Sequence, residues 1–148
     1  MALFQAFNIS ASGMTAERFR TDIIAENVAN VNTTRTEDGS PYRRKIVTFA
    51  EKDDTASFKD TLARTSKYYG GNGVKVTKVL EDEETDYNME YDPSHPDADE
   101  NGYVSYPNVN IVTEMTNLID ASRGYEANVT AFNSMKAIAQ AGLQVGKQ

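Results

Sequence analysis

An apolar repeat in the C-terminal part of the chain constrains the fold more than any other feature. Between Ile111 and Leu143, ten positions are separated by alternating steps of four and three residues, and eight of them are apolar. The ten positions are Ile111, Met115, Leu118, Ser122, Tyr125, Val129, Phe132, Lys136, Ala139 and Leu143. A repeat of 3.5 residues is typical of a helix that packs lengthwise against another helix.

This predicted helix has a recognisable start but needs a partner. Pro107 blocks its extension backwards, Asn108 or Asn110 can act as the N-cap, and Glu114 lies near the positive end of the helix dipole. About 34 residues at about 1.5 Å each make a rod of about 50 Å. Because the remaining residues cannot build a core along such a rod, we expect a second helix of similar length.

The N-terminal residues supply a candidate partner helix. Apolar residues lie near one stripe as far as the segment ENVANVNTT, residues 26–34. They are Phe4, Phe7, Ala11, Met14, Ile24, Val28 and Val31. Asn27, Asn30 and Asn32 are weak helix formers that suit a C-cap, so we expect this helix to end here.

Two glycines and two polar residues interrupt the helical patterns. Gly13 and Gly124 each cost about 1 kcal/mol relative to alanine, and close approach of another backbone is a reason to retain them. Ser122 and Lys136 place polar groups in the predicted seam, where such groups can fix the register or the number of partners. The alternative is that all four are tolerated imperfections on a hydrated face.

The middle of the chain has a different period. Residues 42–49 and 73–80 are rich in β-branched side chains and residues 103–106 alternate, so we predict three short strands. Residues 50–72 favour a polar loop or a short helix. The predicted fold is α+β, with long N- and C-terminal helices paired as an antiparallel coiled-coil-like hairpin and a small β-rich domain inserted between them. The predicted domains are 1–34, 35–107 and 108–148, the first and last forming one helical core.

Composition narrows the possible functions. The chain has no cysteine, which excludes disulfides, thiolate metal sites and cysteine nucleophiles. Its net charge of −7 is concentrated in residues 49–108, which hold six basic and fourteen acidic residues and should repel nucleic acid. No stretch approaches the roughly 18 apolar residues of a membrane span, so we expect no membrane insertion. The N-terminal residues also lack the pattern of a conventional cleaved signal peptide.

Residues 91–108 contain the features that most resemble a chemical site. Asp97, Asp99 and Asn101 match the first half of a calcium-binding EF-hand loop, but asparagine stands where its final glutamate is required. His95, the chain's only histidine, lies in an extended, proline-containing segment where neighbouring side chains point apart. We therefore predict no catalytic residue, no cofactor and no metal, and interpret the segment as a turn-rich connector.

Four segments together carry a family resemblance. SASGMTAERFR and ENVANVNTT are similar to the N-terminal signature of the bacterial flagellar axial proteins, the family of rod, hook and hook-associated subunits. EMTNLIDASRGYEANVTAFNSMK resembles the C-terminal signature of that family. YDPSHPDADENGYVSYPNVN is more specific and resembles subunits of the proximal rod of the flagellar basal body. Residues 50–72 add nothing to the resemblance.

The resemblance implies a structural role without catalysis. Such proteins pass unfolded through the flagellar export apparatus without cleavage. They then assemble with other rod subunits, with copies of themselves and with adjoining basal-body proteins into the rod that spans the periplasm. Their terminal helices form a tube that carries torque and surrounds the export channel, and the middle domain lies outside it. We expect the termini to be largely disordered in the free subunit and to fold on docking.

The helical pattern and the resemblance together assign three groups of residues. The predicted assembly interface comprises Phe7, Met14, Val28, Leu118, Tyr125, Val129 and Phe132. The axial motif comprises Asn27, Ala29, Asn30, Asn32 and Thr33, and the connector comprises Pro93, His95, Pro96, Asp97, Asp99 and Gly102. Three alternatives stay open: a coiled-coil adaptor that binds a partner helix, another flagellar axial protein, and a calcium-regulated module.

Overall fold

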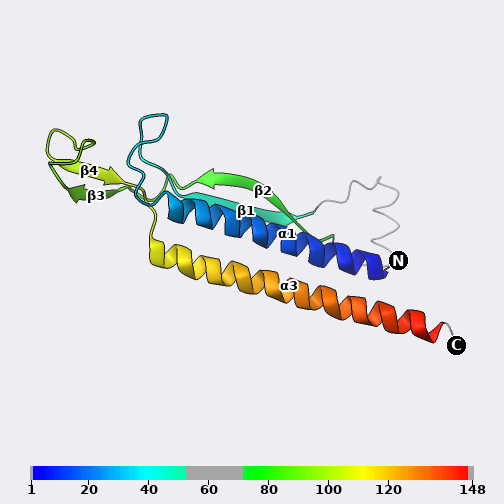
Figure 1. The fold of residues 1–148 in the computed structure, drawn as a ribbon. Helices are drawn as coiled ribbons and strands as arrows, with labels where there is room; N and C mark the ends of the chain where they lie inside the picture. Colours follow the sequence, from blue (N-terminus) through cyan, green and yellow to red (C-terminus); the bar gives the residue numbers. More distant parts are fainter. Residues whose placement is uncertain (1, 53–71, 147–148) are drawn as a thin grey trace, which may run out of the picture. The chain divides into compact units, whose positions relative to one another are not determined.

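Along the chain, one long helix precedes four short strands and a second long helix follows them (Figure 1). The structure, a computed structural model, describes residues 2–52 and 72–146. Helix α1 spans Ala2–Ala29 and helix α3 spans Ile111–Val145. The strands are β1 (Lys45–Glu51), β2 (Val74–Glu81), β3 (Asn88–Tyr91) and β4 (Tyr103–Tyr106). A β region between terminal helices confirms the predicted α+β class.

Both predicted helix boundaries have capping hydrogen bonds. At the end of α1, the amide side chain of Asn30 donates to the Glu26 carbonyl at 3.0 Å, and the Thr33 hydroxyl donates to Asn30 Oδ1 at 3.1 Å. At the start of α3, the Thr113 amide donates to Asn110 Oδ1 at 3.2 Å, so Asn110 is the N-cap. The Asn110 bond satisfies a backbone amide that the start of a helix leaves without an intrahelical partner.

The strands form two separate two-stranded sheets, β1 with β2 and β3 with β4. In the antiparallel β3–β4 hairpin, Asn88 is opposite Tyr106 and Tyr91 is opposite Tyr103. The predicted strand 103–106 coincides with β4, whereas β3 was not predicted. The four β3 residues alternate between polar and apolar, but all four are exposed, so the strand has no buried face.

The other strand boundaries differ slightly from the prediction. Strand β1 begins at Lys45, three residues later than predicted, and continues to Glu51. Of the predicted loop or short helix at 50–72, residues 53–71 lie outside the described residues. Gly102, in the β3–β4 connection, has a φ of 83°, a conformation that glycine adopts without a Cβ clash. A helix both long enough and apolar enough to cross a membrane does not occur within residues 2–52 and 72–146.

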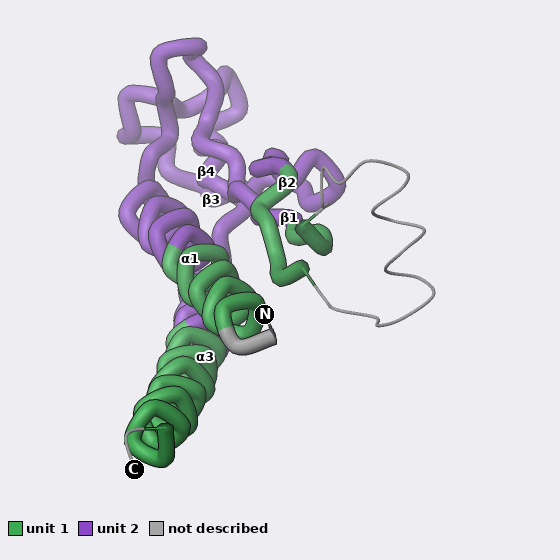
Figure 2. The backbone as a smooth tube through the Cα atoms, turned by 90° about the vertical axis from the view of Figure 1, so that its right-hand side faces the viewer, with its two compact units in different colours: residues 1–18, 49–77, 122–148 green, residues 19–48, 78–121 purple. Residues whose placement is uncertain are grey.

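The chain divides into two compact units, and the division cuts through both helices (Figure 2). Unit 1 comprises residues 1–18, 49–77 and 122–148, and unit 2 comprises residues 19–48 and 78–121. We describe each unit by itself. The domain boundaries expected from the sequence, after residues 34 and 107, stay a prediction.

In unit 1, the first part of α1 packs antiparallel to the last part of α3. The rings of Phe7 and Phe132 meet edge to face with centroids 4.8 Å apart. A Cβ added at Gly13 would lie 2.6 Å from Asn128 Oδ1, closer than real Cβ contacts. A Cβ at Gly124 would lie 3.2 Å from the side chain of Glu17. Both glycines therefore accommodate a neighbouring element as expected, although the group that approaches is a side chain instead of a backbone.

In unit 2, the last part of α1 and the first part of α3 contribute to a small mixed core. Its buried apolar side chains are Ile24, Tyr42, Val104, Val109 and Ala121. Asn27, Asn108 and Glu114 are buried with them. A core with this many polar groups depends on hydrogen bonds as much as on apolar burial.

The inward stripe of α3 lies to one side of the predicted seam. Glu114 and Ala121 are the buried residues of this helix among those described. Leu118, Val129, Phe132 and Ala139 of the predicted seam are half-buried. By contrast, Ile111, Met115, Tyr125 and Leu143 are exposed. The offset has a physical reason, because small and hydrogen-bonding residues face inward and leave the large apolar side chains outside.

Candidate assembly site

A buried polar network joins the end of α1, the start of β1 and the start of α3 within unit 2. It comprises Asn27, Tyr42, Arg44, Asn108 and Glu114. The side chains of Asn27 and Glu114 are among the largest that are fully buried, with residue exposures of 1%. Because α1 and α3 each enter unit 2 here, we call residues 19–29 and 111–121 the helix roots, and residues 2–18 and 122–145 the helix tips.

Asn27 uses the full hydrogen-bonding capacity of its amide. Its Nδ2 donates to the Lys45 carbonyl at 2.9 Å and to Glu114 Oε2 at 3.0 Å. Its Oδ1 accepts from the Lys45 amide and from the Tyr42 hydroxyl, both at 2.9 Å. One side chain on α1 therefore holds the first residue of β1 through both of its backbone groups and also contacts α3.

Glu114 places a carboxylate in this interior, and Arg44 compensates its charge. Arg44 Nε and Nη2 both donate to Glu114 Oε1, each at 2.8 Å. Asn117 adds a longer hydrogen bond to the same oxygen at 3.4 Å. Breaking a buried ion pair by removing one partner is expensive because the other charge stays buried, so this pair fixes the root of α3 against the start of β1.

Asn108 extends the network to the loop after β2. Its Oδ1 accepts from the Arg44 amide at 2.8 Å, and its Nδ2 donates to the carbonyls of Asp82 and Thr85 at 2.9 and 3.2 Å. Burial raises the pKa of Asp82, but hydrogen bonds from Thr85 and Glu84 and the charge of Arg44 outweigh burial and hold that pKa below its ordinary value.

Tyr42 closes the network as a neutral donor. Burial raises the pKa of Tyr42, and the carboxylates of Glu26, Glu81 and Glu114 raise it further. The hydroxyl therefore stays protonated and donates to Asn27 throughout the physiological pH range.

The basic run Arg43–Lys45, which could suggest nucleic acid, has partners inside unit 2. Arg43 lies over the Tyr87 ring, 4.5 Å from its centroid, and donates to the Asp82 carbonyl at 2.8 Å. Arg44 pairs with Glu114, and Lys45 pairs with Glu26. These three cations are therefore engaged in holding the fold.

The predicted interface residues occupy different environments. Within unit 1, Phe7 and Phe132 contact each other, and Met14 and Val129 are half-buried. Within unit 2, Val28 and Leu118 are half-buried. Tyr125 is 40% exposed. The assignment of all seven to an assembly interface stays a prediction.

The axial motif has two local roles. Asn27 belongs to the polar network, whereas Asn30 and Thr33 cap α1. Ala29 and Asn32 are exposed. Sequence reasoning selected Asn27 only as a poor helix former. Its partners Glu114 and Lys45 lie 87 and 18 residues away along the chain, so no local pattern indicates them.

The connector is a turn closed by carboxylates. Asp97 Oδ2 accepts from the Thr34 hydroxyl at 2.9 Å, and Oδ1 lies 3.5 Å from Arg35, which ties the turn to the segment after α1. Asp99 Oδ1 accepts two backbone amides, and the Gly102 amide donates to the Asp99 carbonyl at 3.0 Å. His95 Nδ1 accepts the Asp97 amide at 3.1 Å.

The connector also contains two prolines and the spacing that partly matches a calcium-binding loop. Pro93 and Pro96 are exposed. Within residues 2–52 and 72–146, no three His, Asp or Glu side chains are grouped so that they could hold a metal ion.

The apolar side chains of α3 with the highest exposed fractions form the strongest candidate for an assembly surface. In the root, Val112, Met115 and Ile119 are 75%, 57% and 54% exposed. In the tip, Ile138, Leu143 and Val145 are 67%, 70% and 77% exposed. We call these six residues the outer residues of α3.

Comparison with known families identifies the class of protein that this arrangement represents. The family "Flagella basal body rod protein" matches residues 7–35, and the family "Flagellar basal body rod FlgEFG protein C-terminal" matches residues 100–145. The two matches fall on α1 with its capping segment and on α3 with the strand before it. The chain is thus of the flagellar basal-body rod class.

Full-length relatives refine this assignment. The flagellar basal-body rod protein FlgC of Bacillus subtilis is 42% identical over 99% of this chain and 100% of the relative. FlgC of Borreliella burgdorferi is 42% identical over 98% of each chain, and FlgC of Salmonella typhimurium is 37% identical over 99% of this chain and 100% of the relative. The chain belongs to the FlgC family of flagellar basal-body rod proteins.

Proposed function

We propose that the protein is a structural subunit of the flagellar basal-body rod and has no catalytic role. It assembles with other rod subunits and with copies of itself. A helical tube has contacts that repeat without closing, so each subunit needs two different binding faces. This chain has two long helices, and apolar side chains on both stay exposed to water. It therefore meets this requirement.

The observation that carries the proposal is the exposure of the outer residues of α3. Six large apolar side chains on one helix are between 54% and 77% exposed. Burying each of them against a neighbouring subunit contributes on the order of 1–2 kcal/mol, before the costs of association are subtracted. Exposure of this kind marks a surface that a partner covers.

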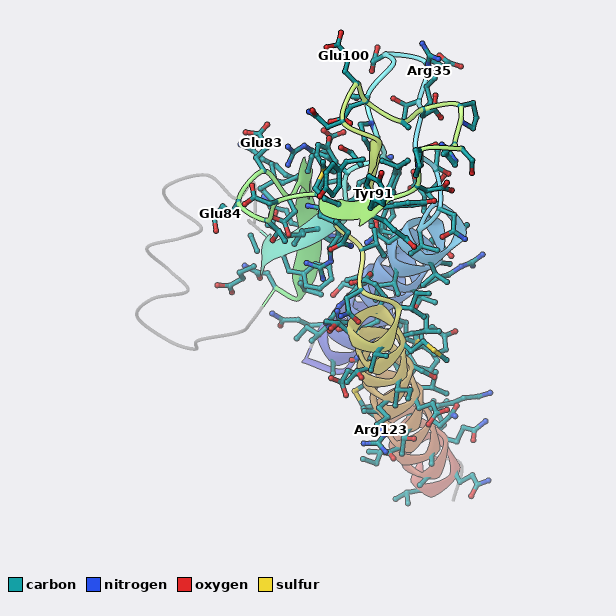
Figure 3. The ribbon with its side chains drawn as sticks, turned by 90° about the vertical axis from the view of Figure 1, so that its left-hand side faces the viewer. Arg35, Glu83, Glu84, Tyr91, Glu100 and Arg123 are labelled. Atoms are coloured by element: carbon teal, nitrogen blue, oxygen red, sulfur yellow. The ribbon has the colours of Figure 1, made fainter. Side chains whose placement is uncertain are left out.

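In the finer proposal, the terminal helices form the tube that transmits torque and surrounds the export channel, and the β-rich insert faces outward. The acidic part of the insert supports this, because residues 79–107 contain no lysine or arginine. The side chains of Glu83, Glu84 and Glu100 point away from the ribbon (Figure 3). Such a surface stays hydrated outside a tube.

The proposal extends to location and partners. The rod spans the periplasm, the subunit reaches it through the flagellar export apparatus without a cleaved signal peptide, and adjoining basal-body proteins contact it. The helical core in this proposal comprises residues 1–34 and 108–148, and the insert comprises 35–107.

Substitution of a helix tyrosine tests the proposal. Tyr125→Asp puts a charge in the predicted interface and is expected to abolish both incorporation into basal bodies and swimming, with the β3–β4 hairpin still folded. The readouts are motility in soft agar, immunoblots of isolated basal bodies and near-ultraviolet circular dichroism of the purified chain. Tyr91→Asp makes the same chemical change at an exposed position of the insert, and a strain that carries it should swim normally. A strain that swims normally with Tyr125→Asp contradicts the proposal.

A further inference from the structure

We propose that the polar network holds unit 2 folded in the free, unassembled chain. The boundary between the preformed and the assembly-dependent parts then lies inside each terminal helix, near residues 18 and 121, where the two units divide. This sharpens the expectation that the termini are disordered before docking, because the helix roots are ordered and only the tips wait for a neighbour. The statement that a neighbour orders the tips rests on the proposed rod role, whereas the order of the roots is a property of the free chain.

The hydrogen bonds of Asn27 and Glu114 in the polar network are complete. Asn27 makes four hydrogen bonds, and both oxygens of Glu114 have partners. The bonds join three segments that are far apart in sequence, since Asn27 and Glu114 are 87 residues apart and Arg44 and Glu114 are 70 residues apart. A buried network gains its stability only when every member is in place, so the three segments order together.

Most of the buried side chains among the described residues belong to unit 2. Among the described residues, the buried side chains that belong to unit 1 are Ser10 and Ala16. The others belong to unit 2, including Ile24, Val104 and Val109. Apolar burial and hydrogen bonding thus coincide in the same unit, which gives the roots a local stability that the tips lack.

Among the described residues, the tip of α3 is only weakly packed. The tip of α3 contains no buried side chain within residues 122–145. Within unit 1, the contacts of this tip include the Phe7–Phe132 ring pair, the approach of Asn128 to Gly13 and the approach of Glu17 to Gly124. A helical segment of this kind is marginal in water, because helices without tertiary packing barely repay the cost of nucleation.

Hydrogen exchange of the full chain tests the inference. The chain is held at a concentration at which sedimentation shows a monomer, and exchange is followed by mass spectrometry at neutral pH. We expect amides 23–29 and 115–121 to exchange at least about 100-fold more slowly than amides 5–18 and 125–145. Equal protection along each helix, whether strong or absent, would overturn the inference.

Variants separate the network from ordinary helix stability. Glu114→Ala removes the carboxylate that Arg44 and Asn27 share, and we expect protection to fall in 23–29 and in 115–121 together. Asp120→Ala removes an exposed carboxylate from the same root and should change neither segment. Loss of protection in 115–121 alone would show that the network does not couple the roots and would overturn the inference.

A milder substitution decides the case if Glu114→Ala unfolds all of unit 2. Arg44→Lys keeps the charge but loses the forked geometry that reaches Glu114 through two nitrogens. We expect a partial loss of protection, about 10-fold and similar in both roots. A loss confined to one root, or no loss in either, contradicts the coupling.

Discussion

The root and the tip of α3 are stabilised by different means. The root, residues 111–121, buries Glu114 in the polar network and Ala121 beside it. The tip, residues 122–145, buries no side chain among its described residues and exposes Ile138, Leu143 and Val145. One continuous helix therefore has a root fixed by buried contacts within its own chain and a tip without such contacts among its described residues, although both parts expose apolar side chains.

Helix α1 repeats this difference in a weaker form. Its root buries Ile24 and Asn27, whereas its tip buries Ser10 and Ala16 and leaves Phe4 68% exposed. The difference suits a subunit that must be stable enough to keep its shape and still adhere to neighbours. Fixing the roots by polar contacts leaves apolar side chains for intermolecular contacts.

Removing the central amide of the network should have the largest effect on the free chain. Asn27→Ala removes the hydrogen-bond partner of the Lys45 amide and carbonyl, of the Tyr42 hydroxyl and of one Glu114 oxygen, Oε2. We expect a loss of about 3 kcal/mol in the free energy of unfolding of unit 2. Urea unfolding followed by circular dichroism measures it. Asn32→Ala, at an exposed position of the same motif, should stay within about 0.5 kcal/mol of the parent. Equal unfolding midpoints for the two variants would show that the network is not the main support of the root.

Two glycine substitutions on the tips should have opposite effects on assembly. Gly13→Ala places a methyl group against Asn128, and we expect the overpacking to cost about 1–3 kcal/mol when the tips pack. Gly142→Ala meets nothing within 4 Å and should gain about 1 kcal/mol from helix propensity. The measurement is the ratio of tagged variant to untagged parent subunits in isolated basal bodies of a strain that expresses both. If Gly13→Ala enters the rod as readily as Gly142→Ala, the close packing of the tips is not part of assembly.

The pH dependence of stability should report on the root through Asp82. Because the pKa of this carboxyl is lower in the folded state than the ordinary 3.8, its contribution is present above about pH 4 and is lost as the pH falls through the folded-state pKa. Unfolding midpoints measured between about pH 6 and pH 3 should therefore fall more steeply for the parent than for Asp82→Asn. Parallel curves would exclude Asp82 as a contributor.

The smallest effect is expected in the connector. His95→Gln removes an acceptor for the Asp97 amide and a ring contact with Tyr106, both in a partly exposed turn. We expect a change within about 0.5 kcal/mol in unfolding and normal swimming. A severe motility defect would indicate that this histidine contacts another basal-body protein.

The sequence predicts the helices and the general arrangement well, because hydrophobic periodicity and capping residues are local signals. For the same reason it predicts β4, and it offers Asn110 as one of two candidates, with Asn108, for the N-cap of α3. It does not predict β3, whose residues are all exposed, or the pairing of Arg44 with Glu114 across 70 residues. The inward stripe of α3 was also missed, because apolar periodicity marks surface to be covered without saying which chain covers it.

The central claim is that the outer residues of α3 are covered by neighbouring subunits whereas the polar network stays within one chain. An electron cryo-microscopy map of isolated basal bodies, at a resolution that shows side chains, tests this most directly. We predict that Val112, Met115 and Ile119 contact helices of an adjacent subunit and that Asn27, Arg44 and Glu114 bind one another as they do here. A map in which those three apolar side chains face solvent, or in which Glu114 pairs with a different chain, would contradict the account.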